Sequence, residues 1–244
     1  MRITRTPRTA PTTRRTLLRA SAATAAAGVL AAGSSPVGAA PRTRSATAAR
    51  LATPAAALKE LAAGNRRWRT LHQRHPHETA GVRSALVSGQ SPFALILGCI
   101  DSRVPPELVF DQGLGDLMTV RSAGEVLDEA VLGSIAYGVL ELGIPLVVVL
   151  GHQSCGAVAA AVHAEETGES LPAHIQYVAD QIRPAIVHGQ HGDARVDATV
   201  SAQVRLVRSR LARETDLAAK VAAGELAIVG ARYELSTQLV HGVG

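Results

Sequence analysis

Three side chains that can bind a metal or hold a proton follow directly on a short apolar run. Residues 94–98 read Ala-Leu-Ile-Leu-Gly, the pattern of a strand buried on both faces. Cys99, Asp101 and Arg103 come next, at alternate positions. A thiolate is a soft metal ligand, and a guanidinium can hold a carboxylate by two parallel hydrogen bonds. The pattern therefore indicates a functional site at the carboxyl end of this strand.

A second apolar run ends in the same way, because residues 145–150 are followed by His152 and Cys155. The carboxyl ends of parallel strands lie along one edge of a sheet, where such folds place ligands, so we expect both groups of side chains to meet. Two thiolates and one imidazole suit a tetrahedral Zn²⁺ ion, and three protein ligands leave a fourth position open, as in catalytic zinc sites. Cys155 would also lie near the start of the next helix, whose dipole favours a thiolate.

These residues also have structural interpretations. The chain has two cysteines, which in an exported protein commonly form a disulfide. Asp101 or Ser102 could cap a short helix, which would leave Arg103 as a surface charge. The H-x-x-C spacing alone is a weak signal, and its specificity comes from its pairing with C-x-D-x-R at another strand end.

Strand-like and helix-like segments alternate along the chain. This order predicts an α/β fold, in which a single domain has a mostly parallel central β-sheet flanked by helices. The expected strands are 93–98, 117–120, 145–150 and 226–229; the expected helices are 54–71, broken near Gly64-Asn65, and segments within 128–143, 156–168 and 197–224.

The amino-terminal segment differs in composition from the rest. Residues 1–40 hold six arginines and no acid, and without them the net charge falls from +5 to −1. The pair Arg14-Arg15, the Ala/Gly run after it and a small-residue exit predict a twin-arginine signal peptide over 1–40 that is removed, then a linker over 41–54. We therefore expect export by the twin-arginine route, to the periplasm or out of the cell. A disordered tail and a retained membrane anchor are the alternatives.

Composition narrows the class of partner. The excess of basic residues belongs to the leader, and aromatic residues make up only 2% of the chain, so we expect no nucleic-acid partner. No apolar stretch in the rest of the chain approaches the ~18 residues of a transmembrane helix, so we expect no stable membrane span in the mature chain. A hydrophobic content of 47% is enough for one domain with a real core.

The motifs resemble those of the β-class carbonic anhydrases, in particular their plant-type branch. "CIDSR" at 99–103 and "GHQSCG" at 151–156 are similar to the family's paired zinc signatures, and "GQSP", "VRSAG" and "LAIVGARYEL" occupy the expected places. The resemblance covers residues 55–244 and implies one Zn²⁺ per subunit. It implies roles for the five residues already described: Cys99, His152 and Cys155 as zinc ligands, and Asp101 and Arg103 as a catalytic dyad.

The resemblance also implies three substrate-binding residues. Gln90 matches a glutamine that hydrogen-bonds substrate in the plant-type branch, Tyr137 matches a pocket tyrosine, and Gly156 follows the last zinc ligand. Their structural alternatives are a turn residue, a helix-packing residue and a helix-start glycine. Ser122 and Glu125 stand where the family often has asparagine. Other departures are Met118, in place of a plant-type pocket aromatic, and Ile96, in place of a tryptophan that in another branch accompanies a regulatory bicarbonate site, so we expect no such site.

The implied function is that of a lyase, the zinc-dependent reversible hydration of CO₂ to bicarbonate and a proton by zinc-bound hydroxide. Because two thiolates cancel the charge of the metal, we expect activity that rises on the alkaline side. The resemblance further implies a homodimer or a higher even oligomer, with the pocket at the dimer interface. The alternatives are a related zinc hydrolase that acts on CS₂ or COS, a non-catalytic zinc-binding homologue, and a disulfide-stapled binding module.

Overall fold

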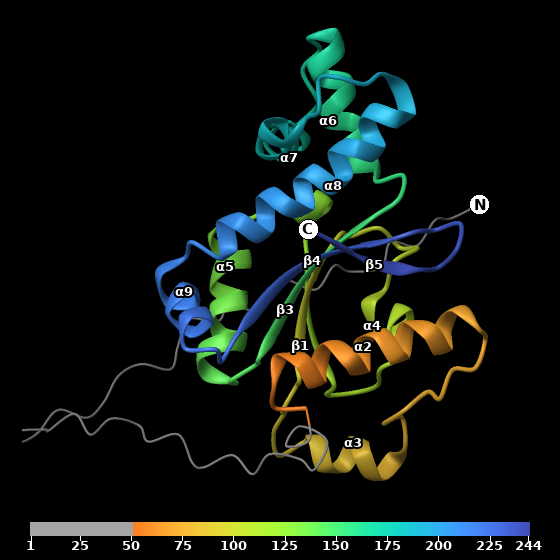
Figure 1. The fold of residues 1–244 in the computed structure, drawn as a ribbon, viewed down its shortest axis with the longest axis vertical. Coiled ribbons are helices and arrows are strands. Elements are labelled where there is room, and N and C mark those ends of the chain that lie inside the picture. The colour runs from red at the N-terminus through yellow and green to blue at the C-terminus, as the bar shows by residue number, and fades with distance from the viewer. Residues whose placement is uncertain (1–50) are drawn as a thin grey trace, which may run out of the picture. The chain divides into compact units, whose positions relative to one another are not determined.

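The computed structural model describes residues 51–244, so the predicted signal peptide and most of the predicted linker lie outside the described residues. The strands within this range are β1 (Ala94–Gly98), β2 (Leu117–Arg121), β3 (Leu146–His152), β4 (Ala227–Tyr233) and β5 (Val240–Val243). They form a sheet in the order β2-β1-β3-β4-β5, in which the first four are parallel and β5 is antiparallel to β4 (Figure 1). The expected α/β fold with a mostly parallel sheet is confirmed.

Helices cover both faces of the sheet and its carboxyl edge. In Figure 1, α2 and α4 lie on one side of the sheet, α5, α8 and α9 on the other, and α6 and α7 beyond the carboxyl ends of the strands. The helices are α2 (Pro54–Arg69), α3 (Ala80–Leu86), α4 (Pro106–Val109), α5 (Glu129–Ala136) with its π-helical extension η2 (Tyr137–Glu141), α6 (Gly156–Thr167), α7 (Ile175–Ile182), α8 (Gly192–Leu211) and α9 (Thr215–Ala222), with short 3₁₀ turns η1 (Ala123–Glu125) and η3 (Arg183–Ala185).

The central strands are apolar at successive positions because both of their faces are buried. In β1, Ile96 packs in the cluster under α2 and α4, whereas Leu95 and Leu97 pack in the cluster under α5, α8 and α9. A third cluster surrounds the carboxyl ends of β1 and β3 and includes Cys99 and Cys155. The strand ends that carry the candidate site are therefore held from three sides.

The expected break of the first helix at Gly64-Asn65 is wrong, because α2 continues through both residues. A Cβ on Gly64 would lie 1.7 Å from the carbonyl oxygen of Phe110, so glycine serves here as a point of close contact. The buried Asn65 amide donates to the carbonyls of Val109 and Gln238, at 3.1 and 2.9 Å, and its oxygen accepts from the Val240 amide at 2.9 Å. Packing and these hydrogen bonds outweigh the low helix propensity of the pair.

Among the helices of residues 51–244, none has the length and apolar character that crossing a lipid bilayer requires.

Candidate active site

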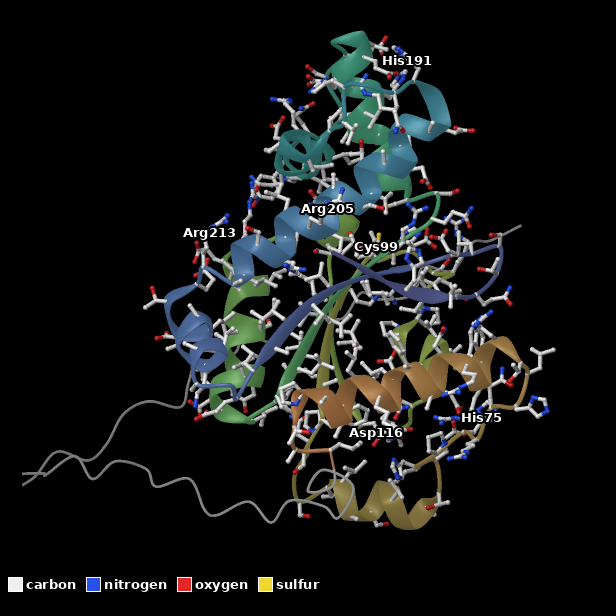
Figure 2. All side chains as sticks on the ribbon, viewed as in Figure 1. His75, Cys99, Asp116, His191, Arg205 and Arg213 are labelled. Carbon is white, nitrogen blue, oxygen red and sulfur yellow. The ribbon has the colours of Figure 1, made fainter. Side chains whose placement is uncertain are left out.

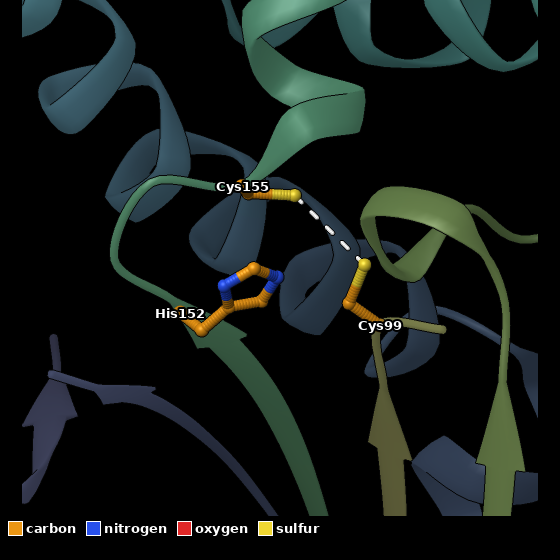
Figure 3. A group of neighbouring side chains, drawn as sticks. All are labelled: Cys99, His152 and Cys155. Atoms are coloured by element: carbon orange, nitrogen blue, oxygen red, sulfur yellow. Dashed lines mark hydrogen bonds between the residues drawn. The ribbon is translucent and has the colours of Figure 1, made fainter. Parts of the chain in front are cut away.

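The ends of β1 and β3 bring three metal-binding side chains together. Cys99 directly follows β1, His152 is the last residue of β3, and Cys155 precedes the first turn of α6. The register pairs Gly98 of β1 with Leu150 of β3, so the residues beyond these positions emerge at the same edge. Their ligand atoms lie within 4.8 Å of one another and all three residues are buried (Figure 3).

The hydrogen bonding of His152 suits a metal ligand. Its Nδ1 lies 2.9 Å from the carbonyl oxygen of Gln153 and donates to it, which leaves Nε2 with a free lone pair. Nε2 is buried and has no hydrogen-bond partner among the described residues. A buried nitrogen lone pair beside two thiols is the donor set that Zn²⁺ satisfies, so these residues fit the metal.

The two cysteines are free and are not joined. Their sulfur atoms lie 3.9 Å apart, compared with about 2.05 Å in a disulfide. The hydrogen bond from Cys155 lowers the pKa of Cys99 despite its burial, and the Gly124 amide, whose nitrogen lies 3.4 Å from Cys99 Sγ, helps. The same bond between the sulfurs, together with burial, raises the pKa of Cys155. A divalent cation bound by both sulfur atoms would displace the thiol protons.

Asp101 faces this group and is held by Arg103. The Arg103 Nε and one terminal nitrogen donate to the two carboxylate oxygens at 2.9 and 2.7 Å, and the Arg103 amide donates to Oδ1 at 2.9 Å. This side-chain hydrogen bond is the main reason that the pKa of Asp101 falls to about 2. Asp101 Oδ2 lies 3.8 Å from His152 Nε2, so the ionised carboxylate points toward the metal-binding atoms.

The helix-cap alternative for Asp101 is not what the structure shows. Pro105 precedes α4, and no side chain caps that helix. Arg103 instead reaches the turn between β3 and α6, where its terminal nitrogen donates to the carbonyl of Ser154 at 3.3 Å. The guanidinium thus connects the turn after β1 to the turn after β3.

A cavity of about 340 Å³ opens beside Cys99 and Asp101. Gly156 lies in its wall, and a Cβ added there would meet no atom within 4 Å. Apart from Ile100 and Ala123, the rest of the wall comes from the segments around α6 and α7 and is apolar: Ala157, Ala160, Leu171, Ile175, Val178 and Ala179. The site therefore joins an ionised carboxylate and the metal-binding atoms to an apolar space for a small uncharged molecule.

Two of the implied substrate-binding residues lie elsewhere in the subunit. Gln90 comes before β1, near Phe93, whose amide donates to the carbonyl of Asp116 at the amino end of β2. Cys99 and Asp116 lie well apart in Figure 2. Gln90 precedes the amino end of β1, Cys99 follows its carboxyl end, and Gln90 does not line the cavity beside Cys99 and Asp101. Tyr137 is next to Gly138, which packs against Leu95 near the same amino end.

Glu125 is a buried carboxyl at this edge that sequence reasoning did not assign. Its residue is 1% exposed, its Oε1 has no hydrogen-bond partner among the described residues, and burial raises its pKa. A glutamate is ordinarily expected on the surface. The sequence offered one indication that Glu125 lies near the site. It stands in the segment directly after β2, and that segment starts at the same edge of the sheet as Cys99 and His152.

Known proteins are similar to this chain in sequence and fold. The family model described as carbonic anhydrase matches residues 94–240. Carbonic anhydrase 2 of Mycobacterium tuberculosis is 45% identical over 184 residues, which cover 75% of this chain and 89% of the relative. The carbonic anhydrase of Mycolicibacterium smegmatis is 44% identical over 185 residues, which cover 75% of this chain and 90% of the relative.

Solved structures agree. The β-carbonic anhydrase of Coccomyxa, solved in complex with acetazolamide, is 26% identical with a TM-score of 0.60, and the match covers 66% of this chain and 75% of that one. The arrangement of two thiols, an imidazole and an arginine-held aspartate thus occurs on the fold and sequence of one enzyme family. The chain belongs to the β-class carbonic anhydrases, zinc enzymes that interconvert CO₂ and bicarbonate.

Proposed function

We propose that Cys99, His152 and Cys155 hold the zinc ion of this enzyme and that CO₂ is hydrated in the cavity beside Asp101. The observation that carries this assignment is the convergence of the three ligand atoms within 4.8 Å, next to an ionised carboxylate and an apolar space. Zinc bound there supplies a Lewis acid that makes hydroxide available from water near neutral pH. The protein's own side chains then orient that nucleophile and the substrate.

Asp101 orients the attacking oxygen. With its pKa at about 2, the carboxylate is ionised at neutral pH and can only accept hydrogen bonds. It would accept a hydrogen bond from the attacking hydroxide, which would turn an oxygen lone pair toward the carbon of CO₂. Arg103 fixes the carboxylate plane by two hydrogen bonds and anchors it to Ser154. The dyad is therefore a positioning device whose charge does not change during the reaction.

The apolar wall of the cavity supports the choice of substrate. CO₂ is small, uncharged and without a net dipole, so it enters such a space more readily than water or an anion does. Bicarbonate carries a charge, and the same wall disfavours its stay. Gly156 keeps this space open next to the zinc ligand Cys155.

The substitution Asp101→Asn tests the assignment. We expect kcat for CO₂ hydration, measured by stopped flow, to fall about 100-fold while bound zinc stays at the wild-type level. Asp216→Asn, which removes an exposed carboxylate near the start of α9, is the matched control and keeps full activity. Wild-type activity in Asp101→Asn, or loss of zinc in proportion to activity, would remove the proposed role.

We further propose that the enzyme is a homodimer or higher even oligomer of the plant-type branch, in which Gln90 and Tyr137 serve the site of a partner subunit. Both residues are exposed and lie toward the amino end of the sheet, so they are available to a second copy. A β-carbonic anhydrase of Sordaria macrospora, 19% identical with a TM-score of 0.63, is one of two from that organism described as tetrameric. A shared site of this kind would explain two pocket residues that the single subunit keeps away from its own zinc ligands.

We also propose export by the twin-arginine route, with removal of residues 1–40. The support is the sequence alone: the Arg14-Arg15 pair, the Ala/Gly run and the concentration of positive charge in this segment. In cell fractionation, the wild-type chain is expected outside the cytoplasm and shortened, and the double substitution Arg14→Lys and Arg15→Lys is expected to leave it full-length in the cytoplasm. Equal export of both chains would contradict the proposal.

A further inference from the structure

Arg121, at the end of β2, connects that strand to the turn that follows the neighbouring strand β1 and begins at Cys99. It is the last residue of β2 and pairs in register with Gly98, the last residue of β1. From there its side chain reaches over the end of β1. Nε donates to the carbonyl of Cys99 at 2.8 Å, and one terminal nitrogen donates to the carbonyl of Asp101 at 2.7 Å, with the carbonyl of Val104 farther away at 3.5 Å.

The turn that Arg121 contacts carries both a zinc ligand and the catalytic carboxylate. Its middle is open to solvent, because Ile100 is 61% exposed and Ser102 and Arg103 are exposed. An exposed turn with few apolar contacts is free to open locally unless hydrogen bonds hold it. The Asp101 carbonyl also accepts the Val104 amide, at 3.1 Å, but that bond lies inside the turn. Arg121 ties the turn to a different strand.

We propose that Arg121 is a positioning residue that fixes the turn from Cys99 to Val104, and through it the direction of the Cys99 sulfur and the Asp101 carboxylate. The inference rests on the proposed roles of those two residues. A guanidinium suits the task because its donors are fixed in one plane and can reach two carbonyls at once. Lysine has a single nitrogen on a flexible stem and cannot span both in the same way.

The charge of Arg121 is not used in an ion pair. In the part of the chain that the structure describes, no carboxylate lies within ion-pair distance of it, and residues 1–50 contain no aspartate or glutamate. The contacts that the side chain makes are to backbone carbonyls of the turn and of Val104. The geometry of the donors, and not the neutralisation of an acid, is therefore what the residue contributes.

The test uses Arg121→Met, Arg121→Lys and a control, Arg205→Met, in the zinc-loaded full chain. Arg205 is an exposed arginine of α8 for which the described structure shows no hydrogen bond or ion pair. Three measurements are made: kcat and KM for CO₂ hydration, the rate of zinc transfer to a chelating dye, and amide hydrogen exchange at residues 100–104 in the metal-free protein. Circular dichroism checks that each variant is folded.

We expect Arg121→Met to lose kcat by about 10- to 100-fold with little change in KM, to release zinc faster by a similar factor, and to exchange the turn amides faster. Arg121→Lys should show the same three changes to a smaller degree, and Arg205→Met none. If Arg121→Lys matches wild type in all three measurements while the folded Arg121→Met variant shows the changes, the positive charge and not the two-carbonyl hydrogen bonding is responsible. The proposal is then overturned. It is also overturned if both variants keep wild-type zinc release and turn exchange.

These results are separable from a failure of the proposed catalytic site. If Asp101 does not act in catalysis, Asp101→Asn keeps its activity while Arg121→Met still releases zinc and exchanges its turn amides faster. If the proposed role of Arg121 is wrong, Asp101→Asn loses activity while Arg121→Met behaves as wild type. Should Arg121→Met fail to fold, Arg121→Lys carries the same comparison.

Discussion

At the scale of single residues, Gly156 leaves open space in the wall of the cavity. Gly156 begins α6 directly after Cys155 and lies in the wall of the cavity. A Cβ there would meet nothing within 4 Å, so glycine is not required by packing. On the proposed function, the space in front of it is where CO₂ moves. Replacing its hydrogen by a larger group should change the site without disturbing the fold.

The matched pair Gly156→Val and Gly189→Val checks this argument. At both positions an added Cβ finds open space, and neither glycine has a positive φ, but Gly189 is not among the residues that line the cavity. We expect Gly156→Val to lower kcat/KM for CO₂ about tenfold through crowding of the cavity, with zinc retained and the melting temperature within a few degrees of wild type. Gly189→Val should leave kcat/KM unchanged. Equal kinetics in the two variants would show that the cavity is not the path of the substrate.

The residues of the site differ in how far the sequence could predict them. The positions of Cys99, Asp101 and His152 could be predicted from the sequence. Parallel strands end at the same edge of a sheet, so residues at or just after the ends of neighbouring strands lie close together. The raised pKa of the Glu125 carboxyl could not be predicted, since it depends on burial by segments far away in the sequence. Arg121 belongs to a recognised motif, but its function as a donor to another strand's turn becomes visible only in three dimensions.

At the scale of elements, α2 is held to the sheet by close contact and by one buried amide. Gly64 allows the helix to touch the carbonyl of Phe110, and Asn65 connects α2 to the residue that ends α4 and to the segment around β5. Strand β5 itself was not expected. Its sequence Val-His-Gly-Val is short and interrupted by glycine, so its strand conformation depends on pairing with the edge of β4.

The expected break of α2 at Gly64 was wrong, and the close contact that explains this also predicts the effect of a substitution there. Glycine usually weakens a helix interior, so Gly64→Ala would stabilise α2 by up to about 1 kcal/mol if propensity alone mattered. Because the new Cβ would lie 1.7 Å from the Phe110 oxygen, we expect instead a loss of about 3 kcal/mol in the free energy of unfolding, measured by urea denaturation. Gly81→Ala, in α3 with its nearest atom at 3.9 Å, is the control and should be neutral or slightly stabilising. A stabilised Gly64→Ala would contradict the contact.

A buried carboxylate at the end of α4 makes stability depend on pH. Asp111 accepts hydrogen bonds from the Arg67 side chain and from the backbone amides of Arg74 and His75. Burial raises the pKa of this carboxyl, but the donors outweigh burial and the pKa lies below its ordinary value. A lowered folded-state pKa stabilises the native protein above the unfolded pKa of about 3.9, and this contribution is lost as the pH falls through the folded-state value.

Asp111→Asn tests that contribution. At pH 7 we expect it to lower the free energy of unfolding by about 2 kcal/mol, because an amide cannot replace the charge-assisted bonds. The difference from wild type should be constant from pH 7 to about 5 and should shrink below about pH 4, as the wild-type carboxyl takes up a proton. Denaturation series at several pH values measure it. A difference that stays constant down to about pH 2 would show that the charge of Asp111 is not what stabilises the fold.

At the scale of the whole molecule, the subunit holds two separate parts of one proposed pocket. The zinc-binding atoms and Asp101 lie at the carboxyl edge of the sheet, whereas Gln90 and Tyr137 lie toward its amino end. Within the subunit, neither Gln90 nor Tyr137 lines the cavity beside Cys99 and Asp101. A two-fold symmetric dimer can bring the two parts together. In such a dimer, Gln90 and Tyr137 of each copy can contact the zinc-binding edge of the other copy, which completes two equivalent sites.

Mixed oligomers distinguish a shared site from a self-contained one. Subunits with Asp101→Asn and subunits with Gln90→Ala are each expected to lose most of their activity. When the two chains are co-expressed with different tags and mixed dimers are isolated through both tags, one of the two sites combines an intact Asp101 with an intact Gln90 from the other chain. We expect these dimers to regain about half of the wild-type activity. If Gln90 acts within its own subunit, every site in the mixed dimer carries one defect and activity stays at the level of the single variants, so this outcome would remove the shared pocket while leaving the zinc site in place.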